Sequence, residues 1–272
     1  MILLKRSLNI VGLLLLALLF IFPFVWMVST SLKTLGEAMT FPPKWLPEVL
    51  QWQNFAAAWN SGPFLQYLTN SLLVTGGILL LQFVTVVPAA YAFARYQFRG
   101  QKVLFALIMI TLMIPAQLIF LPVYIQMSNW GLLNQVWALI LPFASSAFGI
   151  FLLRQSFKQV PHELIEAARL DDASEWKIMW RVMVPLAKPT LITFALFSFI
   201  THWNDYFWPL VMTTNNDART LPVGIAQLRN TEGGVSWNTL MAGNMLLVIP
   251  VLFVFLLAQR QIIRAFTYTG VK

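Results

Sequence analysis

The sequence PHELIEAARLDDASEWKIMWRVMVPLAKP, residues Pro161–Pro189, is a densely charged segment in an otherwise strongly apolar chain. Residues 103–153, which lie just before it, contain no Asp, Glu, Lys or Arg. Charged side chains are costly in the hydrocarbon of a bilayer, so this segment must lie outside the membrane on one side. We therefore expect Pro161–Pro189 to be a sizeable loop to which another protein docks.

The composition is that of a membrane protein. Of the 272 residues, 58% are hydrophobic and 10% are charged, and the mean hydropathy is +0.71. Soluble domains carry roughly 25% charged residues, so we expect an all-α integral membrane protein. The chain has no cysteine, which excludes disulfide bonds and thiolate metal sites within it. A net charge of +8 would suggest nucleic acid for a soluble protein, but here the distribution of the charge matters more.

Apolar stretches along the chain have the length needed for six transmembrane helices of about 20 residues each. We expect all six to belong to one transmembrane domain that covers residues 1–272. The first stretch is longer than the roughly 7–15 apolar residues of a signal peptide, so we expect it to be a retained helix. The predicted spans are approximately residues 7–32, 66–94, 103–127, 134–157, 190–212 and 239–262.

Lysine and arginine are distributed unequally between the two sides that these spans define. One side, with both termini and the 161–189 loop, holds 14 of the 18 basic residues. The positive-inside rule places that side in the cytoplasm. The segments 33–65 and 213–238 are then expected to face outward.

Within the charged loop, the pattern predicts two short amphipathic helices joined by a turn. Pro161 suits the start of the first helix, because its missing N–H would have no intrahelical partner there. The sequence Asp171–Ser174 interrupts the pattern, and Ser174 is suited to cap a second helix. A spacing of i, i+3, i+4, i+7 gives the second helix one apolar face. A helix lying on lipid headgroups is an equally weighted interpretation. The residues of this face are Trp176, Met179, Trp180 and Met183.

Motifs for nucleotide or metal chemistry are absent from the sequence. There is no G-x-x-x-x-G-K-[ST] motif, and the dipeptide Gly-Lys never occurs, so we expect any nucleotide site to be on a partner. His162 and His202 are far apart and belong to no metal-ligand spacing. We therefore expect no catalytic residue, no metal and no bound cofactor in this chain.

A resemblance to a known family rests on several motifs that occur in order. EAARLDDAS, followed by VPLAKP, resembles the EAA signature (EAAxxDGA, with a downstream LP or VP) of ABC importer permeases. The flanking sequences are similar to its carbohydrate-uptake branch of maltose, multiple-sugar and glycerol-3-phosphate type, in particular to the second of two paired permease subunits. These flanking sequences are PAAYAFARYQFRG, LMIPAQLIFLPVYIQMSNWGLLNQVWALILP, FGIFLLRQSFKQVP, WNDYFWPL, LPVGIAQL and LAQRQIIRAFTYTGVK.

The resemblance implies a six-helix permease of the type I ABC importer fold in the cytoplasmic membrane of a bacterium or archaeon. Such a permease pairs with a different permease subunit, and two ATPase subunits bind the pair from the cytoplasm and hold ATP and Mg. An extracytoplasmic binding protein delivers the sugar or oligosaccharide. The same machine carrying glycerol-3-phosphate or its diesters is the close alternative. A stand-alone secondary transporter or channel is a further alternative, which the absence of detectable internal duplication disfavours.

The family's coupling motif, which contacts an ATPase, is carried onto this chain residue by residue. Glu166, Ala167 and Ala168 begin the motif, and Asp171 matches its aspartate. The family's glycine falls at Asp172, so the chain departs from the pattern there. Asp tolerates the left-handed conformation better than most residues, so the geometry of the turn is what this departure affects. The expected coupling residues are Glu166, Ala167, Ala168, Arg169, Asp171, Asp172 and Trp176.

Two outward-facing groups complete the expected sites. Polar residues near membrane depth usually face a bundle interior or an aqueous cavity, so the polar end of the fifth span is a candidate for the translocation path. An interfacial anchor is the alternative for the aromatic residues there. The 213–238 loop resembles the family's outer loop that contacts the binding protein, although it could be a plain connector. The pathway candidates are Trp203, Asn204, Asp205 and Tyr206, and the docking candidates are Leu221, Pro222, Gly224, Gly233 and Gly234.

Overall fold

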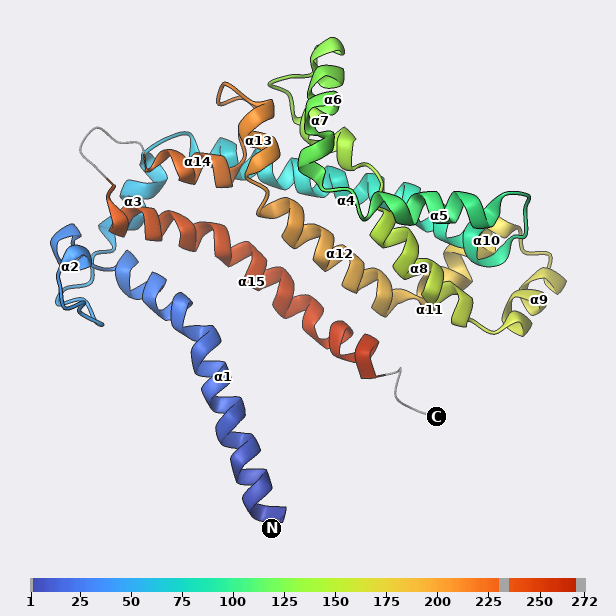
Figure 1. The fold of residues 1–272 in the computed structure, drawn as a ribbon, viewed down its shortest axis with the longest axis horizontal. Coiled ribbons are helices and arrows are strands. Elements are labelled where there is room, and N and C mark those ends of the chain that lie inside the picture. Colours follow the sequence, from blue (N-terminus) through green and yellow to red (C-terminus); the bar gives the residue numbers. More distant parts are fainter. Residues whose placement is uncertain (1, 230–234, 268–272) are drawn as a thin grey trace. The chain divides into compact units, whose positions relative to one another are not determined.

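The computed structural model describes residues 2–229 and 235–267, and in these residues the chain is helical with no β-strand (Figure 1). The expected all-α class is therefore confirmed. The chain forms two compact units: one contains the residues up to Leu65 with Leu221–Pro250, and the other contains Gln66–Thr220 with the residues from Val251.

The first unit contains α1 and the short helices that follow it in the sequence. Helix α1 (Ile2–Ser31) is long and apolar enough to cross a membrane between Asn9 and Ser31. Between Ile10 and Val25 its apolar side chains are exposed in this chain, as expected for contact with lipid or another subunit. The other helices of this unit are α2 (Leu35–Met39), α3 (Gln53–Asn60), α14 (Leu221–Gln227) and the first half of α15 (Trp237–Thr267).

A single asparagine fastens the end of α1. The side-chain amide of Asn54 on α3 donates to the main-chain oxygens of Ser31 and Lys33, at 2.8 Å each. Asn238 on α15 in turn donates to the Asn54 amide oxygen at 2.9 Å. Carbonyls at a helix C-terminus have no intrahelical partner, so these bonds satisfy groups that would otherwise be unpaired.

The second unit is built around α4 (Phe64–Arg95), a single helix of 32 residues. Its C-terminal half packs with α8 (Ala147–Gln159) and α12 (Lys188–Trp203) around a buried apolar cluster. A Cβ atom at Gly149 on α8 would lie 2.5 Å from Cε2 of Phe194 on α12. Glycine is therefore what allows these two helices to approach closely, as small residues do between membrane helices.

Three of the six predicted spans are broken helices. The predicted span 103–127 comprises α5 (Gln101–Thr111) and α6 (Ala116–Asn129), bent by 97°. Pro115 lies at the break, and a proline both lacks an N–H and disfavours the helical conformation of the residue before it. The span predicted at 103–127 is therefore two helices in the structure. By length and composition, three straight helices and three bent pairs give up to six spans in the described residues.

The predicted span 134–157 is interrupted as well. It comprises α7 (Val136–Ile140), η1 (Leu141–Phe143) and α8, bent by 43°. Two polar side chains of α4 bind the carbonyls that the break leaves free: Gln82 donates to the Phe143 oxygen at 3.0 Å and Thr85 to the Ala144 oxygen at 2.8 Å. Irregular backbone at membrane depth is tolerated when neighbouring helices satisfy it in this way.

The predicted span 190–212 ends as the sequence suggested, with an interruption near Asp205. Helix α12 stops at Trp203, and α13 (Phe207–Met212) begins three residues beyond Asn204. The spans predicted at 66–94 and 239–262 lie within α4 and α15, and the one predicted at 7–32 corresponds to α1.

Candidate coupling and transport sites

The charged loop folds as two helices joined by a tight turn, as the sequence predicted. Helix α9 (His162–Leu170) is followed by α10 (Glu175–Ile178), and the chain continues through one π-helical turn, η2 (Met179–Met183), into α11 (Val184–Leu186). Ser174 caps α10, because its hydroxyl accepts a hydrogen bond from the Lys177 N–H at 3.4 Å. The predicted cap is therefore present.

The turn between the helices depends on Asp172, which has φ 53°. This is the left-handed conformation that ends many helices and that glycine adopts most easily. The turn is closed by main-chain bonds from the Asp171 N–H to the Ala167 oxygen (3.1 Å) and from the Ala173 N–H to the Ala168 oxygen (3.0 Å). Asp172 thus adopts the backbone geometry that its position in the EAA-like motif requires.

One face of the loop is anchored in the chain's own core. Ile165 on α9 is buried, as are Met179 and Met183 in the π-helical turn, and all three belong to the cluster that α4, α8 and α12 build. Trp176, which shares the apolar face predicted from the sequence, is not part of this buried cluster, because its side chain is 65% exposed. The anchoring of the loop is thus provided by Ile165, Met179 and Met183, and Trp176 remains free to contact a partner.

The opposite face of α9 is exposed and carries most of the expected coupling residues. Glu166, Ala167, Arg169, Asp171 and Asp172 are exposed, and Ala168 is half-buried against the core cluster. Leu170, which the sequence reasoning did not single out, is 86% exposed. An exposed leucine and tryptophan within a charged loop are typical of a contact surface rather than of a solvated linker.

Glu175 connects this loop to a membrane-spanning helix. Its Oε2 accepts a hydrogen bond of 2.6 Å from the hydroxyl of Tyr91 on α4, and its Oε1 accepts bonds from Arg169 on α9 at 2.8 Å and 2.9 Å. The hydrogen bond to Glu175 raises the pKa of Arg169 above its ordinary value. One carboxylate therefore joins α9, α10 and α4. The sequence pattern singled out neither Glu175 nor Tyr91 as a contact between the loop and α4.

Arg95, the last residue of α4, fixes the point where the loop begins. Its Nη2 donates to the main-chain oxygens of Phe157 (2.6 Å) and Val160 (2.5 Å), at the C-terminal end of α8. A cation at this end of a helix binds unpaired carbonyls and interacts favourably with the helix dipole. The α4–α8 connection thus holds the base of the loop in place.

The four pathway candidates lie at the α12–α13 break but have different environments. Trp203 is 1% exposed, and its ring stacks on Phe199 with the centroids 5.4 Å apart. A solute needs an accessible ring face, so Trp203 is removed from the candidates. Asp205 accepts a hydrogen bond from the Trp208 N–H (3.3 Å) and so caps α13. Asn204 is exposed, and Tyr206 is 43% exposed.

The docking candidates of the outer loop are mostly inaccessible. Leu221, Pro222 and Gly224 lie in α14 and are buried, so in this structure they do not form an exposed surface, and docking at them stays a prediction. Residues 221–225 are all buried, as in a helix that is enclosed on every side, and the resemblance alone could not reveal this. Gly233 and Gly234 lie outside the described residues.

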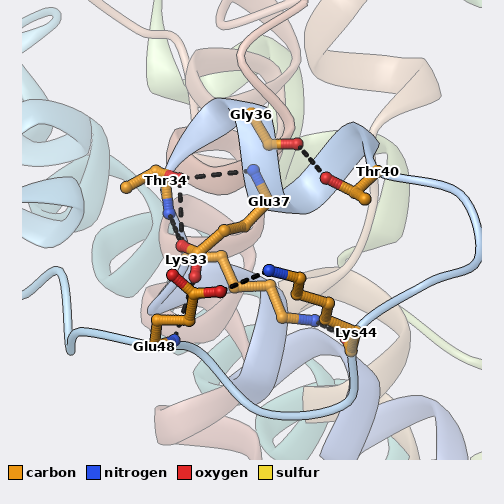
Figure 2. A network of polar contacts seen from close by, with 7 residues as sticks. All are labelled: Lys33, Thr34, Gly36, Glu37, Thr40, Lys44 and Glu48. Atoms are coloured by element: carbon orange, nitrogen blue, oxygen red, sulfur yellow. Dashed lines mark hydrogen bonds and ion pairs between the residues drawn. The ribbon is translucent and has the colours of Figure 1, made fainter.

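The segment 33–65, which the sequence predicts to face outward, carries an ordered polar network (Figure 2). Lys33 is 1% exposed; its ammonium lies 4.5 Å from the Trp26 ring centroid and donates to the Lys44 main-chain oxygen. Burial lowers the pKa of Lys33, and the nearby Glu37 opposes this shift. The N–H of Glu48 donates to Glu37 at 2.9 Å and is the main cause of that carboxyl's lowered pKa. The segment is thus a folded arm and not a loose connector.

The sequence matches the family described as "binding-protein-dependent transport system inner membrane component" over residues 86–268. It is 32% identical over 245 residues to the diacetylchitobiose uptake system permease protein NgcG of Streptomyces coelicolor, which covers 89% of this chain and 81% of the relative. It is 32% identical over 269 residues to the arabinooligosaccharides transport system permease protein AraQ of Halalkalibacterium halodurans, with 96% and 95% covered. The sn-glycerol-3-phosphate transport system permease protein UgpE of Yersinia pestis is 34% identical over 255 residues, with 91% and 90% covered.

A solved structure agrees with these relationships. A chain from the crystal structure of a bacterial ABC transporter involved in the import of the acidic polysaccharide alginate superimposes with a TM-score of 0.84 at 26% identity. The match covers 94% of this chain and 96% of the other. With its apolar helices, this chain is a multi-pass membrane protein with an ABC importer permease fold, and it belongs to the family of binding-protein-dependent transport system inner membrane components.

Proposed function

We propose that this chain is one of two permease subunits of an ATP-binding-cassette importer that carries a sugar or oligosaccharide across the cytoplasmic membrane. The observation that carries this proposal is the loop at α9 and α10, which exposes an EAA-like surface while it is anchored in the permease core. The substrate class is supported by relatives named for diacetylchitobiose and arabinooligosaccharide uptake, and by the alginate importer.

Glycerol-3-phosphate is the second candidate substrate, because UgpE is 34% identical to this chain. Both candidates use the same machine, so the cognate binding protein is the component that distinguishes them. Thermal-shift screening of that protein should give a rise in melting temperature with an oligosaccharide and none with glycerol-3-phosphate. The opposite result would assign the importer to glycerol phosphates. A stand-alone transporter or channel is disfavoured by membership of a binding-protein-dependent family.

The proposed partners are a second permease subunit, two ATPase subunits and an extracytoplasmic binding protein. ATP and Mg would be held by the ATPases, since the sequence lacks a Gly-Lys dipeptide and therefore a phosphate-binding loop. No step of ATP hydrolysis is assigned to a residue of this chain. Its contribution is to bind the ATPases, to line part of the pathway, and to change conformation.

In the proposed mechanism, closure of the ATPases on ATP moves α9 and α10 together as a lever. The buried side chains Ile165, Met179 and Met183 hold the lever to the membrane helices. The Tyr91–Glu175 hydrogen bond adds a polar connection to α4. Packed elements of this kind shift between discrete arrangements rather than deforming continuously. The result would be alternating access between inward-open and outward-open states while the binding protein releases its ligand.

Topology can be tested with single cysteines, because the native chain has none. The basic-residue distribution places Gln159 at the cytoplasmic face and Leu46 outside. In intact cells an impermeant thiol reagent should label Leu46→Cys and not Gln159→Cys, and both should react after permeabilisation. Both positions are exposed, so lack of reaction would not come from burial. Reversed labelling would contradict cytoplasmic termini and the docking of ATPases to α9.

Asp205 is the strongest remaining pathway candidate, and its cap on α13 sets the design of the test. Asp205→Ala should lower uptake severalfold while the complex still assembles, because both the charge and the cap are lost; loss of a cap alone costs about 1 kcal/mol. Asp205→Asn keeps a side-chain acceptor and removes only the charge. We expect uptake by this variant to be reduced as well. Parental uptake by Asp205→Asn would show that Asp205 only caps α13.

A further inference from the structure

A basic cavity lies where three helices of the second unit end. It has a volume of about 480 Å³ and is formed by the end of α4, the start of α5 and the last turns of α8, with the first residue of α9 at its rim. Because α4 crosses the membrane and Arg95 is its last residue, the cavity lies at the membrane boundary. Its basic lining residues are Arg95, Lys102, Arg154, Lys158 and His162, and the uncharged polar residues Tyr96, Gln97 and Gln101 also line it.

The cations of this cavity are not neutralised within the described residues. In that part of the chain, no carboxylate forms an ion pair with Arg95, Lys102, Arg154 or Lys158. His162 is the exception among the lining residues, since its Nδ1 lies 3.4 Å from Glu166. A cavity lined by several cations, with no acidic residue in its lining, is suited to an anion.

The side chains differ in how firmly they are held. Arg154 donates from Nε to the Phe93 oxygen at 3.1 Å, and its guanidinium lies 3.9 Å from the Phe105 ring centroid. This arrangement fixes one planar donor group in the wall. Lys102 and Lys158 are exposed and can move toward a ligand. A fixed arginine with two mobile lysines matches the chemistry of phosphate recognition, in which arginine gives geometry and lysine gives charge.

The surroundings of the cavity indicate where the phosphate comes from. Helix α5 starts at the cavity and is apolar, and none of its residues is buried in this chain. Val103, Leu104 and Leu107, which follow Lys102, are between 48% and 64% exposed. A ligand with a phosphate group in the cavity could therefore lay acyl chains along α5. Basic pockets between membrane helices at the cytoplasmic side commonly bind anionic headgroups.

We propose that this cavity binds the phosphate headgroup of an anionic phospholipid beside the base of the α9–α10 loop. The site goes beyond the proposed transport function and does not depend on the identity of the transported solute. A free phosphate ion shares the headgroup's chemistry, and the experiment separates these two sources. An acidic side chain of an ATPase subunit is the competing occupant.

The test uses the assembled importer in nanodiscs and two variants that each lose two positive charges. The pocket variant is Lys102→Gln/Lys158→Gln, and the control is Arg99→Gln/Lys188→Gln, whose residues are exposed and do not line the cavity. The lipid probe is phosphatidylglycerol as a minor component of phosphatidylcholine nanodiscs, and the phosphatidylglycerol retained per complex is measured by native mass spectrometry. The ion probe is radiolabelled inorganic phosphate added to nanodiscs of phosphatidylcholine alone.

The pocket variant should bind phosphatidylglycerol with an affinity lower than the parent's by roughly tenfold or more. The control should match the parent, and labelled phosphate should not bind. The parent and the control could instead bind labelled phosphate while the pocket variant does not, with lipid retention the same in all three. That result would show that the cavity binds free phosphate and would overturn the proposal of a lipid headgroup. An equal loss of lipid in both variants would overturn the site, since general surface charge would explain it. Loss of the ATPase subunits with unchanged lipid would assign the cavity to an ATPase side chain and overturn the proposal.

Discussion

Ala168→Trp is expected to remove the ATPase subunits from the purified complex while the two permease subunits stay paired. Ala168 is half-buried against the core cluster, and its carbonyl closes the turn through Ala173. An indole at this position would have to displace the core packing or project from α9 into the ATPase. Overpacking of a core typically costs about 1–3 kcal/mol of stability, so the α9 surface would be held out of its native position. Co-purification of the ATPases and binding-protein-stimulated ATP hydrolysis are the measurements, and both should fall sharply.

The structure provides a sibling variant that separates two causes of this loss. Ala167 is exposed and lies next to Ala168 on α9. Ala167→Trp leaves the core packing intact and adds bulk only on the exposed face, so a loss of ATPase binding there must come from the interface. Ala106→Trp, at an exposed alanine of α5, is the matched control and should behave as the parent. Both loop variants could instead show parental levels of ATPase co-purification, of stimulated ATP hydrolysis and of uptake. This loop would then not be the transmission element, and the interpretation of it as a helix lying on lipid headgroups would replace the coupling role.

The sequence was most informative where the chemistry is local. A cap needs only a serine at the right place, and Ser174 forms it. The turn needs a residue that tolerates a left-handed conformation, and Asp172 adopts one with φ 53°. The break near Asp205 also follows from local signals, because a polar residue ends an apolar span. In each case the deciding interaction lies within a few residues of the signal, so a pattern of single residues predicts it.

The sequence was uninformative where the partner is distant in the chain. Tyr91 and Glu175 are separated by 84 positions, and only the packing of α4 against the loop brings them together. The same limitation explains Trp203, whose position at the end of a span suggested contact with a solute. Its burial is a tertiary fact that periodicity does not contain. Pro115 signals the helix break, yet the size of the bend, 97°, does not follow from a single residue.

Glu175→Ala is expected to uncouple ATP hydrolysis from uptake without releasing the ATPases. Tyr91 is 4% exposed, and its hydroxyl donates a hydrogen bond to the charged carboxylate of Glu175. Hydrogen bonds to charged groups contribute about 1.5–3 kcal/mol. Because Glu175 is partly exposed, the contribution of this hydrogen bond should lie toward the lower end of that range. The Arg169 contact is weaker, because its side chain is 45% exposed and exposed ion pairs contribute about 0–1 kcal/mol. The connection to α4 should therefore dominate, and the ratio of solute imported to ATP hydrolysed should fall roughly tenfold.

A double-mutant cycle identifies the connection that matters. Tyr91→Phe removes only the hydroxyl, so it should lower the transport-to-hydrolysis ratio in the same direction as Glu175→Ala but by less. Because both changes break the same bond, the double variant should be no worse than Glu175→Ala alone; additive losses would mean that Tyr91 and Glu175 act independently. Tyr124→Phe is the matched control, because Tyr124 packs through its ring, whose centroid lies 5.8 Å from that of Phe120. This variant should leave the ratio unchanged. Parental coupling in Glu175→Ala would mean that the buried apolar side chains of the loop, among them Ile165, Ile178, Met179 and Met183, are enough to transmit the motion to the membrane helices.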